Sequence, residues 1–178
     1  MMEPATWTSR TWSFGRETSL FLPILERLRG TPARAEELVH TVDVDVLTAR
    51  RGGKWSGQEH LGHLADLHEI DDRRLTEFLQ GEPVLTAADM TNAATERAHH
   101  NSGRAADVLE RLRRTRMALV QRLESLSIED VQRSAIHPRL RRRLSLVDWM
   151  FFTAEHDDHH LAHARYAAWR AEAGRVPR

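Results

Sequence analysis

The 178-residue chain is long enough for one domain with a substantial core, and its 26 basic and 26 acidic residues give a formal net charge of zero. This balance argues against a nucleic-acid partner, which a strong basic excess would favour. The absence of cysteine excludes disulfides, thiolate nucleophiles and cysteine-ligated zinc, so any metal chemistry would use histidine and carboxylate ligands. No apolar run has membrane-spanning length and no export signal is recognisable, so we expect a cytoplasmic protein without a membrane partner.

The first third of the chain combines an irregular arm with short helices. Residues 1–16 carry aromatic side chains without a clear period, which predicts an arm that lays them on the surface of the domain. Apolar residues recur at helical spacing over residues 17–29, with Pro23 marking a helix start near Leu22. Thr31 and Pro32 then predict an N-cap and first helical position for a segment that reaches about Thr41.

The middle of the chain predicts two long helices joined by an irregular segment. Ser56 and Glu59 form a capping box that starts a helix, and Gly81 ends it. This helix carries His63 on the flank of its apolar stripe. Residues 82–102 break any long pattern, and a second helix with an arginine-rich outer face follows over residues 103–126.

The last third predicts a connector and one more long helix. Residues 127–144 read as a connector without a convincing strand, and they include the basic run from Arg139 to Arg143. Ser145 and Asp148 predict the start of a helix that ends near Gly174. Four substantial helices predict an all-α four-helix bundle, with residues 1–178 as one helical domain.

A cluster of histidines marks the final helix. Four of the eleven histidines lie within residues 155–163. His156 and His160 project within about 40° of each other on the face that continues as Trp149 and Phe152, and His163 lies about 20° from His156. Two imidazoles one turn apart on an inward face can bind a transition metal, with a third ligand supplied by another element.

Three features together resemble the DinB superfamily, in particular its metal-dependent hydrolases and low-molecular-weight-thiol transferases. They are the segment Gly52-Gly53-Lys54-Trp55-Ser56 that leads into residues 59–66, the His156/His160 pair, and the arginine-rich helix between them. The resemblance covers roughly residues 17–170. It implies an up-down-down-up bundle whose crossover is the segment 82–102, and it implies a homodimer.

The resemblance also implies a site and a reaction. Carried over position by position, the ligands of a divalent metal ion, zinc or nickel, are His63, His156 and His160. His163 is expected to be an acid/base group, a fourth ligand or a packed neighbour. The implied function is a thiol-dependent S-transferase that activates a small-molecule thiol, such as bacillithiol or mycothiol, against an electrophile. A metal-dependent hydrolase and a non-catalytic metal-binding stress protein are the alternatives.

The remaining polar residues receive simpler interpretations. We expect Glu59 to cap its helix rather than orient His63, and Asp66 to support that ligand. Asp157 and Asp158 are expected to face solvent. His60 and His159 lie outside the inferred ligand geometry. The arginine run is expected to be a solvated loop, with the alternative that it gathers an anionic substrate. No site role is expected for the remaining single or paired histidines His40, His99, His100 and His137.

Overall fold

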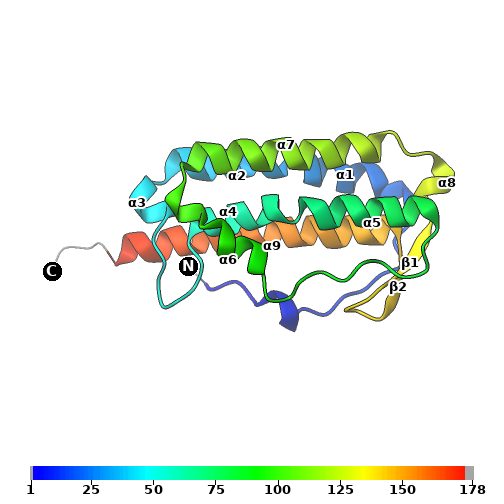
Figure 1. The fold of residues 1–178 in the computed structure, drawn as a ribbon, viewed down its shortest axis with the longest axis horizontal. Helices are drawn as coiled ribbons and strands as arrows, with labels where there is room; N and C mark the ends of the chain where they lie inside the picture. The colour runs from blue at the N-terminus through cyan, green and yellow to red at the C-terminus, as the bar shows by residue number, and fades with distance from the viewer. Residues whose placement is uncertain (1, 175–178) are drawn as a thin grey trace.

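The computed structural model describes residues 2–174, and helices packed side by side form most of it (Figure 1). The first half contains α1 (Phe21–Arg29), α2 (Thr31–Thr41), α3 (Val44–Leu47), α4 (Gly57–Asp66) and α5 (His68–Gln80). The second half contains α6 (Ala93–Ala98), α7 (Ala105–Glu124), α8 (Ile128–Val131), the strands β1 (Ser134–His137) and β2 (Arg142–Ser145), and α9 (Leu146–Ala173). Short 3-10 turns lie at Trp7–Ser9, Thr18–Leu20 and His100–Ser102.

Four arms form the bundle: α1 with α2, α4 with α5, α7, and α9. The first arm runs parallel to α9, because Arg27 meets Glu155 and, further along both segments, Glu37 meets Arg165. The second arm runs antiparallel to α9. The site of Gly57 near its start lies against Ala164, whereas Phe78 near its end packs on Trp149.

The third arm completes the predicted topology. Arg111 of α7 pairs with Asp66, and Arg122, three turns later, pairs with Asp72, so α7 runs parallel to the second arm. The directions are therefore up, down, down and up, and the crossover between the two parallel arms is the segment that contains α6 (Figure 1). The predicted four-helix bundle is confirmed.

Local structure departs from the sequence prediction at three places. The helix expected from Ser56 to Gly81 is two segments, α4 and α5, which meet at Leu67. Thr31 is not an N-cap: it is the first residue of α2, no side chain caps this helix start, and the Thr31 hydroxyl donates to Asp157. The expectation of no strand is also wrong, because β1 and β2 form an antiparallel hairpin with Ala135 opposite Leu144.

The apolar core divides into two clusters along the bundle. One lies toward the hairpin and includes Leu28, Phe78 and Trp149, and the other lies toward α3 and includes Leu38 and Leu61. Between them each arm contributes a residue to one buried polar network, which consists of Thr31, Asp71, Arg116 and Asp157. The core is thus interrupted at mid-length by a polar layer.

Arg116 is the centre of this polar layer. Its guanidinium donates to Asp71 over 3.2 Å and to Asp157 over 2.7 Å, and the Thr31 hydroxyl donates to the other oxygen of Asp157 over 2.7 Å. Burial raises the pKa of Asp157 to about 6 even with Arg116 beside it. The expectation that Asp157 faces solvent is therefore wrong.

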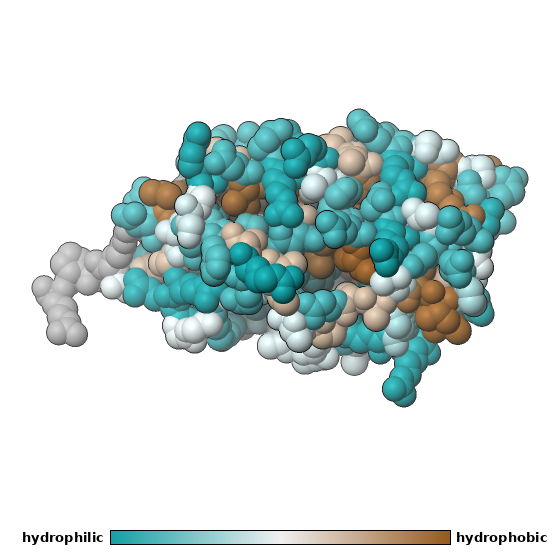
Figure 2. Space-filling view, viewed as in Figure 1, coloured by the Kyte–Doolittle hydropathy of each residue, from teal (hydrophilic) through white to brown (hydrophobic). Residues whose placement is uncertain are grey.

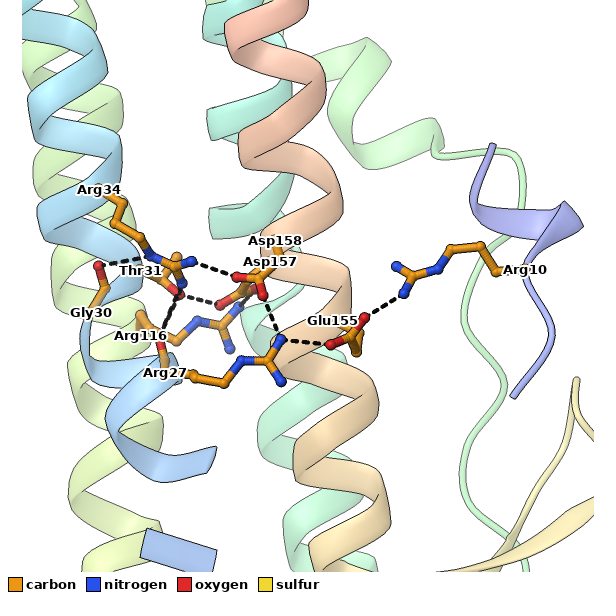
Figure 3. Close-up of polar contacts among 9 residues, drawn as sticks. All are labelled: Arg10, Arg27, Gly30, Thr31, Arg34, Arg116, Glu155, Asp157 and Asp158. Carbon is orange, nitrogen blue, oxygen red and sulfur yellow. Dashed lines mark hydrogen bonds and ion pairs between the residues drawn. The ribbon is translucent and has the colours of Figure 1, made fainter. Parts of the chain in front are cut away.

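The same stretch of α9 carries a second, more exposed set of ion pairs. Arg27 bridges Glu155 and Asp158, Arg34 also pairs with Asp158, and Arg10 reaches Glu155 from the N-terminal arm (Figure 3). Asp158, which was expected to face solvent, is half-buried and pairs with two arginines. These contacts join α9 to α1, α2 and the arm, and the Arg116 pair joins it to α7.

Hydrophilic side chains cover most of the face seen in Figure 2, and its apolar areas are separate from one another. Across residues 2–174, none of the helices combines the length and apolar character that crossing a bilayer requires.

Candidate metal centre

His63 of α4 and His156 and His160 of α9 lie together at mid-bundle. One nitrogen from each ring lies within 4.8 Å of those of the other two. The Nε2 atoms of His156 and His160 are 3.2 Å apart. Two ligands of a tetrahedral ion with bonds of about 2.0–2.1 Å are about 3.3 Å apart, so this pair already has the spacing of a shared ion. The α4–α9 antiparallel contact therefore brings together the three residues that the sequence singled out.

Thr95 fixes the ring of His63. Its hydroxyl lies 2.9 Å from Nδ1 of His63 and 2.9 Å from a carboxylate oxygen of Asp66. Burial alone would raise the pKa of Asp66, but hydrogen bonds from His100, Thr95 and Arg111 outweigh it and hold this pKa below its usual value. The carboxylate can only accept, so the Thr95 hydroxyl donates to it and accepts the Nδ1–H of His63. Nε2 of His63 is left unprotonated, as a metal ligand must be.

The ring of His60 contacts that of His160. The two Nδ1 atoms lie 2.9 Å apart, so one donates to the other. With Nδ1–H of His160 as the donor, its Nε2 carries the free lone pair that faces Nε2 of His156. His60, which the sequence placed outside the ligand set, is thus a partner of a candidate ligand.

The three candidate ligands are neutral at physiological pH. Burial lowers the pKa of His63 to about 4. Burial, with the neighbouring histidines as further causes, also holds the pKa values of His156 and His160 well below the ordinary value. Neutral imidazoles are the form that binds metal, so protons do not compete for these nitrogens near pH 7. The donor set fits a divalent ion such as zinc or nickel.

Two tryptophans cover this histidine cluster. Trp7 of the N-terminal arm meets His156 edge-on, with ring centroids 4.8 Å apart, and Trp55 packs against His63 at 5.0 Å. The predicted placement of the arm's aromatics on the bundle is confirmed, and the contact of Trp7 with His156 ties the arm to the site.

A cavity of about 270 Å³ lies beside His63. Its wall combines the apolar residues Leu67 and Ile70 with charged residues of α5 and of the crossover, among them Arg73 and Asp89. The size approaches the lower end of small-molecule pockets, and the mixed wall suits a compact polar ligand.

His163 lies next to this cluster rather than within the triad. Its ring centroid is 4.3 Å from that of His159 and 5.4 Å from that of His60, and its Nε2 is 3.3 Å from the carbonyl oxygen of Ala5. The acid/base role remains a prediction.

Two carboxylates behave as the sequence indicated. Glu59 accepts the backbone N–H of Ser56 in the predicted capping box and also pairs with Arg50. Asp66 supports His63, but through Thr95 rather than directly.

Sequence reasoning missed Thr95 and His100. His100 is buried, its Nε2 lies 2.8 Å from Asp66, and its ring occupies the space beside Gly62, where a Cβ would lie 2.3 Å from ring atoms. Both residues belong to the irregular crossover, which carries no periodic signal. The absence of a side chain at Gly62, one residue before His63, was the available hint of a close neighbour.

Comparisons with known proteins agree with this architecture. The sequence model of the DinB superfamily matches residues 27–164. The fold is similar to that of YfiT from Bacillus subtilis, described as a probable metal-dependent hydrolase with an unusual four-helix bundle topology. The two structures share 20% sequence identity with a TM-score of 0.76 over 90% of this chain and 93% of that chain. No curated protein sequence matches the chain. The protein belongs to the DinB superfamily.

Proposed function

We propose that this protein binds one divalent metal ion through Nε2 of His63, His156 and His160 and is a metal-dependent enzyme that acts on a small molecule. The observation that carries the proposal is the convergence of three neutral imidazoles, two of which are 3.2 Å apart. Three protein ligands leave coordination positions open, which is the pattern of catalytic rather than structural zinc sites.

The residues around the triad have defined tasks in this proposal. Thr95 and His60 hold the rings of His63 and His160 in the tautomers that expose Nε2. Trp7 and Trp55 limit the access of water to the ring faces. When bound, the ion would supply Lewis acidity and lower the pKa of a water molecule or thiol in its coordination sphere.

Hydrolysis is the reaction that we propose first. YfiT, whose fold this chain shares, is described as a probable metal-dependent hydrolase. Water is the only co-substrate that hydrolysis requires. His159 lies beside the triad and His163 lies beside His159, and both offer imidazoles for proton transfer.

Thiol-dependent S-transfer is the second candidate, and the cavity beside His63 favours it. The chain has no cysteine, so the thiol would be a small molecule that needs a binding space of its own. The 270 Å³ cavity, with both acidic and basic residues in its wall, offers such a space.

The metal site is tested by elemental analysis of untagged protein. We expect about one divalent ion per chain, and we expect His156→Ala to lose it. His159→Ala is the matched control, since it removes an imidazole of the same helix that lies outside the triad. The proposal would be refuted by equal metal content in both variants, or by the absence of metal from the unaltered protein.

Cobalt-substituted protein separates the two reactions. For S-transfer, a small thiol should add a sulfur-to-cobalt absorption band and should be consumed with a model electrophile such as a halodinitrobenzene. For hydrolysis, the same thiol should inhibit the cleavage of a nitrophenyl ester. A folded, metal-loaded protein with neither activity favours the non-catalytic alternative.

A further inference from the structure

Three buried nitrogen atoms near Phe152 have no hydrogen-bond partner among the described residues. They are Nε1 of Trp12, Nε2 of His137 and Nη2 of Arg139. Buried polar groups in folded proteins are nearly always paired, so these three nitrogens require partners from outside the chain, either ordered water or a ligand.

All three atoms are donors. The backbone N–H of Leu140 donates to Nδ1 of His137, so the proton of this neutral ring lies on Nε2. Burial, followed by the charges of Arg74 and Arg139, lowers the pKa of His137 to about 3, so the ring stays neutral. Indole and guanidinium nitrogens can only donate. The missing partner is therefore an acceptor.

The three residues lie around one aromatic ring, that of Phe152. The centroid of Phe152 is 4.9 Å from that of Trp12 and 5.2 Å from that of His137, and Cζ of Arg139 lies 5.6 Å from it. His137 is only 2% exposed. The group thus unites the N-terminal arm, the hairpin and α9.

The charge of this group is positive. Arg139 keeps its charge at neutral pH, and no described carboxylate forms an ion pair with it. Arg74, which is also buried, adds a second positive charge near His137, although Asp71 and Glu77 lie close to it. A buried guanidinium nitrogen beside neutral N–H donors suits an anionic oxygen ligand, and its planar geometry suits a carboxylate.

The group lies one helical turn from the candidate metal centre. Phe152 precedes His156 by four residues on α9, a rise of about 6 Å. Trp7 contacts both rings, at 5.0 Å from Phe152 and 4.8 Å from His156. A small molecule with a carboxylate a few bonds from its reacting atom could therefore occupy both places.

We propose that Trp12, His137 and Arg139 form a carboxylate-binding subsite next to the metal centre, so that the substrate is a small carboxylate-bearing molecule. The assignment of this molecule as substrate rests on the proposed function. The subsite itself does not, because its residues bind no metal. The basic run that reads as a solvated loop in the sequence thus divides: Arg139 turns inward, while Arg141, Arg142 and Arg143 do not share its burial.

Benzoate is the probe, because its ring suits the aromatic walls, and benzamide is its uncharged counterpart. Both are titrated into the full-length chain, with and without metal, while the indole N–H signals are followed by NMR and the Trp12 signal is assigned through Trp12→Phe. We expect saturable binding of benzoate in both metal states, with a shift of the Trp12 signal, and at least tenfold weaker binding of benzamide.

Arg139→Gln should weaken benzoate binding about tenfold or more, because a charged hydrogen bond is lost. The matched control is Arg143→Gln, which removes the same charge from an exposed position of the hairpin and should leave binding unchanged. His137→Phe provides a second test, and circular dichroism checks that each variant is folded.

Several outcomes overturn the subsite. The first is equal affinity for benzoate and benzamide, and the second is an equal loss of benzoate affinity in the Arg139 and Arg143 variants. The third is benzoate binding confined to the metal-loaded protein, which would place the carboxylate on the ion. Binding to metal-free protein together with absent metal or turnover would leave the subsite in place and refute only the proposed function.

Discussion

The hydroxyl of Thr95 accepts the Nδ1–H of His63 across 2.9 Å, so a residue of the crossover sets the orientation of a candidate ligand on α4. The carboxylate of Asp66 anchors this hydroxyl, and His100 and Arg111 anchor the carboxylate. The bundle brings three imidazoles together, but the crossover determines which nitrogen of His63 is free.

Thr95→Val should weaken metal binding about 10- to 100-fold, the usual effect of losing a partner of a metal-bound histidine. Valine keeps the shape of the side chain but can neither accept from His63 nor donate to Asp66. Competition with a chromophoric chelator measures the affinity. Thr95→Ser should retain it, and so should the exposed control Thr91→Val on the same crossover. Unchanged affinity in the Thr95 variant would refute this role.

Gly62→Ala should destabilise the protein by about 1–3 kcal/mol, because the added Cβ would lie 2.3 Å from the ring of His100. Urea unfolding measures the loss. Gly103→Ala is the control: its Cβ would lie 3.7 Å from the His100 carbonyl oxygen, and we expect a change within about 0.5 kcal/mol. Equal effects of the two substitutions would contradict the close packing of His100.

Arg116→Met should cost about 3–5 kcal/mol of unfolding free energy, because it leaves Asp71 and Asp157 buried without their cation. Arg113→Met removes an exposed pair with Glu36 from the same helix and should cost no more than about 1 kcal/mol. Urea denaturation of both variants provides the comparison. A loss of less than 1 kcal/mol for Arg116 would mean that the polar layer contributes little to stability.

Acid should destabilise the metal-free protein through its buried neutral histidines. The pKa values of His63 and His137 are about 4 and about 3 in the folded chain, below the ordinary value near 6.5. The unfolded chain therefore binds more protons between about pH 6.5 and 4, and the unfolding free energy falls as the pH falls through this window. Each of the two histidines adds a slope of about 1.4 kcal/mol per pH unit.

Unfolding midpoints from pH 7.5 to 5 test this slope. His137→Phe should reduce the slope by about 1.4 kcal/mol per pH unit, the contribution of one proton. The exposed control His40→Gln should leave the slope unchanged. A stability that is independent of pH across this range would show that these rings are not buried in neutral form.

The sequence predicted the bundle because helical spacing, the two capping boxes and the breaks at Gly30 and Gly81 depend on neighbours along the chain. The His156/His160 pair could be predicted for the same reason, since one helix fixes the spacing of the two residues. The short hairpin could not be predicted, because strands of four residues are too short to show a clear alternation of apolar and polar side chains.

The error at Asp157 has a specific physical cause. A helical wheel assumes one buried face, but α9 packs against α1 and α2, against α4, and against the N-terminal arm. Its middle is therefore enclosed on several sides, and the carboxylate of Asp157, about 80° around the helix from the His156/His160 pair, meets Arg116. The roles of Thr95 and His100 could not be predicted from the sequence, because only the folded crossover brings these residues to His63 and Asp66.

The position of Trp7 over His156 has a practical consequence for purification. A fusion partner or affinity tag placed ahead of the N-terminal arm would be attached to the segment that covers the candidate metal centre. An oligohistidine tag could supply competing imidazoles there. Metal content and activity should therefore be measured on protein that carries no tag ahead of the arm.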